Sequence, residues 1–462
     1  MGKMKLGFAA LLAVLVVGLV IIVYGCNTAI LTTSEQETVS TTTTLHSTKS
    51  WGTPARIGEE ANRAQPSDVV IDDSGNAIVV WSQLDGTGVG RVYADRYVAG
   101  SGWGTPEVIN INNGSGDALG PQIALDGSGN AIAVWLQKDG AAIGSIYGTV
   151  YANRYVAGSG WGAPEVIGSG SGNATFPDIA MNKNGDAIAG WGQKDNGTGI
   201  ISIYANRYRA GSGWGTATVI ENDDTNADEP EIAVDSSGNA IALWTESDGT
   251  NDSVHANRYA AGSGWGTAAN IGIVTGGVDH QDLAMDKNGN AIAVWDQSDG
   301  TVHRIYTNRY APGAGWGTAI TLENEAGDAF RPKIAIDGSG NAIVVWDQQV
   351  GSIAEIWAKR YTSGSWDVDK TVISNSPLIE AKAEIAMNEG GDAMVVWQHT
   401  IALQVWAKSF TSVSWGTAEK IDGTQAGNGS LLVAINKNGD AVAVWSHGTG
   451  VDRGEIYANQ YH

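Results

Sequence analysis

Aspartates recur at one position relative to a repeated tryptophan, and they form the first candidate site. In five places an Asp lies four residues after the Trp of a segment like Ala-Ile-Ala-Val-Trp. These residues are Asp85, Asp139, Asp195, Asp248 and Asp299. Carboxylates bind Ca²⁺ and attract basic partners. We therefore expect an acidic ligand-binding face, with calcium as the possible cofactor and no other cofactor expected. The alternative is a solvated surface that aids solubility.

Further aspartates precede the repeated segments, and the same face of the protein should carry them. They are Asp117, Asp223, Asp224, Asp228, Asp279 and Asp328. These positions differ between repeats, whereas positions that stay constant are expected to build a scaffold.

Arginines recur in a second pattern, which resembles Tyr-Ala-Asn-Arg-Tyr. Four of them are candidate ligand-binding residues: Arg154, Arg207, Arg258 and Arg309. An Arg near an exposed aromatic ring suits the ring and hydroxyls of a sugar. The alternative is that each Arg stacks on a Tyr and covers the edge of the fold.

Residues for catalysis do not stand out from the repeats. The histidines are scattered, and His399 and His447, which replace a recurrent Gln, are too few for a closed zinc site. We find neither a nucleophile–base pair nor a carboxylate pair that departs from the repeat pattern. The sequence therefore predicts no catalytic residue and no enzyme activity.

The first fifty residues read as targeting and linker segments. Lys3 and Lys5 precede an apolar run that ends at Val23, as in a signal peptide. The segment Val23-Tyr24-Gly25-Cys26 resembles a bacterial lipobox, which implies lipidation of Cys26 and a signal peptide over residues 1–26. An uncleaved membrane anchor and a coincidental cysteine are the alternatives. Residues 27–50 are rich in Ser and Thr and should form a flexible linker.

Two series of tryptophans divide the remaining chain into repeats of about 50 residues. The first series is Trp81, Trp135, Trp191, Trp244, Trp295, Trp346, Trp397 and Trp445. The second is Trp51, Trp103, Trp161, Trp214, Trp265, Trp316, Trp366 and Trp415. We expect the first series to be buried in the core, because such rings bury a large apolar area.

Each repeat reads as four short strands, and repeats of this length with four strands indicate a β-propeller. In one repeat the strands are expected at residues 122–126, 131–137, 151–156 and 161–167. The folded part begins with a fourth strand at Trp51 and ends with a third strand, so the N-terminal strand must complete the last blade. The sequence therefore predicts an all-β fold: a single eight-bladed β-propeller over residues 51–462, with four antiparallel strands per blade.

The turn after each first strand has a constant Gly, as in Asp126-Gly-Ser-Gly-Asn130. Gly permits positive φ in a tight hairpin. The turn is similar to the Asp-box of sialidases and to turns of quinoprotein and outer-membrane assembly propellers. The arginine pattern resembles that of propeller lectins. These resemblances imply the fold and not the chemistry. Phe330-Arg331-Pro332 is similar to a sialidase signature, whose other residues we do not find.

Composition excludes several classes of protein. The formal net charge of −22 argues against nucleic-acid binding, and a single Cys excludes a disulfide scaffold. We expect an exported, monomeric, non-catalytic module of the cell envelope that binds a glycan or an envelope protein. Contact with the membrane would occur only through the N-terminal lipid or anchor. The alternatives are an envelope assembly scaffold and a glycoside hydrolase or sialidase-like enzyme.

Overall fold

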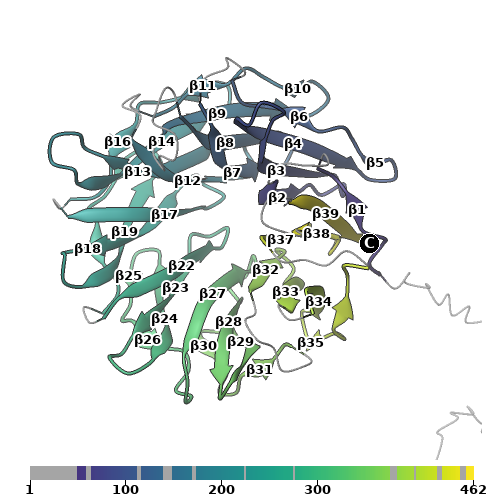
Figure 1. The fold of residues 1–462 in the computed structure, drawn as a ribbon. Coiled ribbons are helices and arrows are strands. Elements are labelled where there is room, and N and C mark those ends of the chain that lie inside the picture. Colours follow the sequence, from purple (N-terminus) through teal and green to yellow (C-terminus); the bar gives the residue numbers. More distant parts are fainter. Residues whose placement is uncertain are drawn as a thin grey trace, which may run out of the picture. The chain divides into compact units, whose positions relative to one another are not determined.

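Strands alone make up the regular structure of the described residues (Figure 1). The structure is a computed structural model that describes residues 49–58, 64–111, 116–138, 148–168, 173–222, 225–273, 276–374, 382–399, 402–423, 429–447 and 454–462. All of them belong to the unit Lys49–His462. The predicted signal peptide, Cys26, residues 27–48 of the predicted linker, Asp139, Asp223 and Asp224 lie outside the described residues. The described part contains no helix that could span a membrane.

Eight antiparallel sheets follow one another around an axis, and each is one blade (Figure 1). The first strand of each blade lies closest to the axis. These strands are β2 (Gln65–Ile71), β7 (Ala118–Leu125), β12 (Ala174–Met181), β17 (Asn226–Val234), β22 (Val278–Met285), β27 (Ala329–Ile336), β32 (Ala383–Met387) and β37 (Leu431–Ile435).

The second and third strands pair in register along their length. The second strands are β3 (Ala77–Leu84), β8 (Ala131–Gln137), β13 (Ala187–Lys194), β18 (Ala240–Ser247), β23 (Ala291–Ser298), β28 (Ala342–Val350), β33 (Ala393–His399) and β38 (Ala441–His447). The third strands are β4 (Gly90–Val98), β9 (Thr149–Val156), β14 (Ile201–Arg209), β19 (Asp252–Ala260), β24 (His303–Ala311), β29 (Ile353–Thr362), β34 (Gln404–Thr411) and β39 (Glu455–Tyr461).

The fourth strand of blades 1 to 7 forms two short pieces that both pair with the third strand. The first pieces are β5 (Gly102–Trp103), β10 (Gly160–Trp161), β15 (Gly213–Trp214), β20 (Gly264–Trp265), β25 (Gly315–Trp316), β30 (Ser365–Trp366) and β35 (Ser414–Trp415). The second pieces are β6 (Glu107–Val108), β11 (Glu165–Val166), β16 (Thr218–Val219), β21 (Ala269–Asn270), β26 (Ile320–Thr321), β31 (Thr371–Val372) and β36 (Glu419–Lys420).

The N-terminal strand completes the last blade, as predicted. The strand β1 (Ala55–Arg56) pairs with β39, and Trp51 forms a β-bridge with Tyr461. The two ends of the folded unit therefore share one sheet. The prediction of a single eight-bladed β-propeller with four antiparallel strands per blade is confirmed.

Tryptophans of the second strands fill the space between blades. All eight side chains of the first Trp series are fully buried, and Trp135 packs with Val80 and Val92 of the preceding blade. Its ring also stacks on that of Tyr151 with centroids 6.2 Å apart. The predicted packing role of this series is confirmed.

The turns after the first strands are held by their own side chains. Asp126 Oδ1 accepts hydrogen bonds from the backbone N–H groups of Ser128 and Asn130 at 2.8 and 2.9 Å. Gly129 adopts a φ of 78°, which favours glycine at this position. The carboxylate thus has a structural role in the hairpin.

Removal of the Ile57 side chain tests whether the closing strand is as firmly packed as an internal one. Ile57 is 3% exposed and packs beside Val69 and Trp81. Its backbone N–H donates to Ile456 at 2.9 Å, just as that of Ile220 donates to Ile203 in blade 3. We expect Ile57→Ala and Ile220→Ala each to lower the free energy of unfolding by about 2–4 kcal/mol in urea titrations. A much smaller loss for Ile57→Ala would mean that the closure frays.

Candidate functional site

The predicted aspartates lie in separate turns between second and third strands. Asp85 accepts a hydrogen bond from the Thr87 backbone N–H at 2.8 Å and one from Arg91 Nε at 2.9 Å. Asp299 makes the equivalent bonds with Thr301 and Arg304. Hydrogen bonds from the two threonine hydroxyls are the largest cause that holds the pKa of each carboxyl well below its usual range.

Asp195 and Asp248 stabilise their turns in the same way. Each accepts hydrogen bonds from the backbone N–H groups two and three residues later in the chain. Among the described residues, none of these four aspartates belongs to a group of three potential metal ligands. The structure therefore gives each a role in its own turn and does not gather them. Binding of calcium or another ligand by this face stays a prediction.

The predicted arginines lie on third strands and pack against the following blade. The guanidinium of Arg207 lies 5.5 Å from the ring centroid of Tyr259, and Arg309 lies 5.4 Å from that of Tyr361. Arg258 stacks on Tyr310 in the same way at 6.0 Å, and Arg154 occupies the equivalent position on β9. Stacking on the neighbouring blade is thus confirmed for three of them, while a ligand role stays a prediction.

The first strands of blades 2 to 7 enclose a different site, a cavity of about 620 Å³ that we call the axial pocket. Its wall includes one residue from a β-bulge in each of four neighbouring strands: Phe176, Glu229, His280 and Arg331. All four have positive φ, between 41° and 55°. Non-glycine residues adopt this conformation at a cost of about 1–3 kcal/mol, and such strain clusters at functional sites. The bulges re-aim these side chains into the pocket.

A sequence pattern within the first strands marks the residues that form this wall. In several repeats the bulge residue precedes a Pro and then a charged residue, as in Phe176-Pro177-Asp178 and Arg331-Pro332-Lys333. The first and third members of this triplet change from repeat to repeat, whereas the strand around them stays constant. Of these residues, only Arg331 stood out from the sequence.

Carboxyl groups occupy the equivalent position of five first strands around the axis, and those of Asp178, Glu231 and Glu384 line the axial pocket. We call Asp68, Asp178, Glu231, Asp282 and Glu384 the carboxylate ring. Asp178 Oδ2 accepts a hydrogen bond from the backbone N–H of Ile232 at 2.7 Å in the next blade. Lys333 takes this position in blade 6, and its Nζ lies 3.9 Å from a Glu384 oxygen.

Burial is the largest cause of the raised pKa values of Asp68, Asp178, Glu231 and Glu384, and neighbouring carboxylates raise them further. Burial, together with the charges of Asp178 and Asp282, raises the pKa of Glu231 well above its usual value. Burial raises the pKa of Asp178 to about 6, although backbone N–H groups oppose the rise. Glu384 first, and then the other ring carboxylates, raise the pKa of Lys333 and keep it charged. The axial pocket therefore holds Glu231, whose raised pKa favours the protonated form, together with the charged Lys333.

Two buried aspartates support the wall from behind. Arg331 donates to Asp347 from Nε at 2.7 Å and from Nη2 at 2.6 Å. His280 Nδ1 lies 3.0 Å from Asp296, whose side chain is fully buried. These contacts join His280 and Arg331 of the pocket wall to the buried aspartates of the second strands.

No protein-family model matches the chain, and no curated protein sequence matches it. Solved structures similar to it include the polysaccharide lyase Uly1 (10% identity, 88% of this chain and 99% of that one, TM-score 0.48). A Penicillium chrysogenum alpha-L-arabinanase is 11% identical over 74% of this chain and 92% of its own, with a TM-score of 0.41. A Hadza microbial sialidase is 11% identical over 68% and 73%, with a TM-score of 0.40.

Two expectations from the sequence are corrected here, because these comparisons do not support them. We expected a non-catalytic binding module and no enzyme activity, whereas the similar structures above are named as glycan-processing enzymes. The physical reason for the error is that the charged pocket residues sit at bulges within strands. Loops that differ between repeats were the expected place for functional groups, and positions constant between repeats were expected to build the scaffold.

Proposed function

We propose that the protein is a glycan-cleaving hydrolase whose active site is the axial pocket. The observation that carries the proposal is the convergence of Glu231, Asp178, Glu384 and Lys333 in one cavity, where burial raises the pKa of Glu231 well above its usual value. Glycoside hydrolysis uses one carboxylic acid that protonates the leaving group and a second, ionised carboxylate. A cleft in which the pKa of one carboxyl group is shifted relative to the others can supply this acid and this ionised carboxylate.

Roles follow from the surroundings of each carboxyl group. Glu231 donates its proton to the glycosidic oxygen, because burial and neighbouring negative charge raise its pKa well above the usual value. Burial raises the pKa of Glu384, and Lys333, whose Nζ lies 3.9 Å from a Glu384 oxygen, opposes that rise. We assign Glu384 the role of base or nucleophile on the opposite side of the bond. Backbone N–H groups hold the carboxyl group of Asp178, which keeps the carboxylate ring in position.

The wall suits a sugar with an acidic substituent. Phe176 leaves 49% of its surface exposed and can stack on a sugar ring. The Arg331 side chain is 36% exposed, and Asp347 holds its guanidinium in place to meet a carboxylate or sulfate group. We therefore propose acidic polysaccharides as the substrate class.

We also propose that the enzyme acts outside the cytoplasm, at the envelope of a bacterial cell. The support is the charged and apolar segment before Cys26 and the Ser/Thr-rich stretch that follows it. Such a location would give the pocket access to polysaccharides that do not enter cells.

The test is a screen of the full chain on neutral and acidic polysaccharides, with three readouts. New reducing ends report cleavage, incorporation of oxygen from labelled water reports hydrolysis, and ultraviolet absorbance reports an unsaturated product of elimination. We expect reducing ends with labelled oxygen on an acidic polymer. Unsaturated ends would mean that the reaction is elimination and not hydrolysis. Absence of cleavage on every polymer tested would contradict the proposal.

A further inference from the structure

We propose that blade 5 binds one first-row transition metal dication, such as Zn²⁺, through Asp279, Asp296, His303 and His280. The site lies beside the axial pocket, which His280 lines. The proposal does not depend on the hydrolase activity proposed above, because it rests on the ligand set alone.

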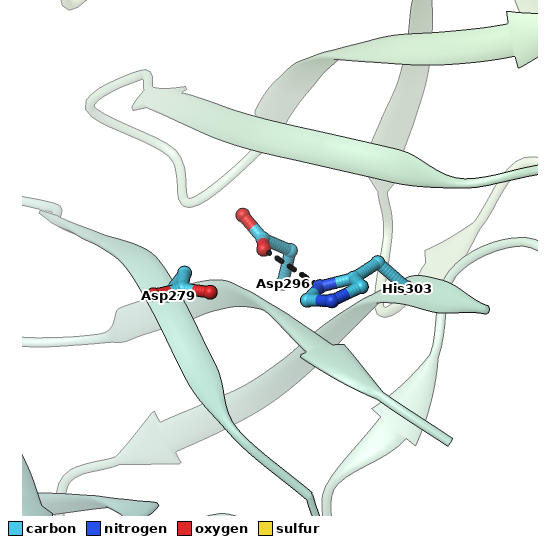
Figure 2. Close-up of side chains that lie close together, drawn as sticks. All are labelled: Asp279, Asp296 and His303. Carbon is cyan, nitrogen blue, oxygen red and sulfur yellow. Dashed lines mark hydrogen bonds and ion pairs between the residues drawn. The ribbon is translucent and has the colours of Figure 1, made fainter. Parts of the chain in front are cut away.

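Three adjacent strands each bring one ligand to a common point (Figure 2). Asp279 comes from β22, Asp296 from β23 and His303 from β24. Their potential ligand atoms all lie within 4.8 Å of one another. Figure 2 shows the three side chains directed toward the same space between the strands.

The imidazole contacts have the spacing of ligands around one ion. His280 Nδ1 lies 3.0 Å from Asp296 Oδ1, and His303 Nδ1 lies 3.3 Å from Asp296 Oδ2. Ligand atoms bound to one zinc at its usual distances are about 3.3 Å apart in tetrahedral geometry. Small rotations of the exposed His280 and Asp279 side chains would complete the set.

The other blades show that this set is specific to blade 5. Asp279 pairs with Asp296 across the sheet, and Asp228 pairs with Thr245 at the same positions of blade 4. His303 occupies the position of Asp252 in blade 4 and of Ala354 in blade 6. Among the described residues, no other group of three His, Cys, Asp or Glu side chains has ligand spacing.

The charges at this point favour a cation. Two carboxylates directly opposite each other in a sheet repel, and Asp296 is fully buried. In blade 6 the equivalent buried Asp347 has the permanent positive charge of Arg331. Blade 5 has imidazoles instead, which in their neutral form are ligands. Two nitrogen and two oxygen donors suit zinc, cobalt or manganese, whereas calcium and magnesium prefer oxygen ligands.

Metal content of the full chain tests the proposal. The chain, produced without a histidine tag, is stripped with a chelator and dialysed against zinc chloride alone. We expect one zinc per chain by elemental analysis, and a visible spectrum with nitrogen ligation when Co²⁺ replaces zinc. Asp279→Asn and His303→Ala should each weaken zinc binding at least tenfold in calorimetric titrations.

Matched variants in blade 4 provide the control. Asp228→Asn and Asp252→Ala change the equivalent positions, and we expect them to leave zinc affinity unchanged. Asp228 is half-buried at the third position of β17, and Asp252 is the first residue of β19, so circular dichroism would report any loss of fold. Absence of zinc in the wild-type chain would overturn the proposal. So would equal affinity in the wild type, Asp279→Asn and His303→Ala.

Discussion

Glu231→Gln is expected to lower kcat on the polysaccharide found in the substrate screen by about 10²–10⁴-fold, with little change in stability. Gln keeps the size of the side chain and removes the proton that the leaving group needs. The wild-type rate should fall as pH rises above the raised pKa of Glu231, because the acid form is then lost. This alkaline limb should disappear in the variant.

Leaving-group dependence separates a general acid from a residue that merely shapes the pocket. A substrate with a good leaving group, such as a nitrophenyl glycoside, needs no proton from the enzyme. Glu231→Gln should therefore retain far more activity on that substrate than on the polymer. Glu229→Gln, on the same strand at the pocket wall, should change KM more than kcat. An equal loss of activity on both substrates would refute the acid role of Glu231.

The propeller could be predicted because its determinants are local and repeat eight times. A buried Trp such as Trp295 and a turn Gly such as Gly289 recur at nearly fixed spacing. The closure followed from counting strands, since Trp51 begins a fourth strand that has no first three. The pairing of Ala55 with Ala458 in the last blade confirms that inference.

The pocket could not be predicted in the same way, because it depends on conformation and on ring closure. The left-handed backbone of Phe176 and Arg331 aims their side chains inward, and residue type alone does not specify a β-bulge. Glu231 and Glu384 are 153 residues apart in the sequence and meet only because blades 4 and 7 face one axis. The rise in the pKa of Glu231 requires that convergence.

The turn aspartates have a structural role that the local sequence also indicates. Asp85 is followed by Gly-Thr, and such a sequence is typical of an Asp that bonds its own turn. Acidic residues at these positions suggested a ligand site, whereas their oxygens accept bonds from neighbouring N–H and O–H groups. Repetition across blades in this case indicated a structural role.

The carboxylate ring also makes stability depend on pH, and Asp68 provides the test. Burial raises its pKa to about 7, against the hydrogen bonds that it accepts from the backbone of Ile123 and Val69. The charges of Asp178 and Glu384 raise it further. In the unfolded chain an Asp titrates near pH 3.9.

Between these two values the folded protein holds a proton that the unfolded chain has lost. The stabilisation is therefore complete below about pH 4 and is lost as pH rises through about 7. For Asp68 alone the loss amounts to about 4 kcal/mol at most. We expect the free energy of unfolding of the wild type to fall between pH 5 and pH 8 in urea titrations.

Asp68→Asn should remove most of the Asp68 share of that fall. The variant loses one hydrogen-bond acceptor for a backbone N–H, so we expect it to be less stable than the wild type at pH 5 by about 1 kcal/mol. At pH 8 it should equal or exceed the wild type, because Asn carries no buried charge. Glu107→Gln, at an exposed position of β6, is the control and should keep the wild-type pH dependence. An Asp68→Asn variant with the same pH dependence as the wild type would show that Asp68 is ionised throughout this range.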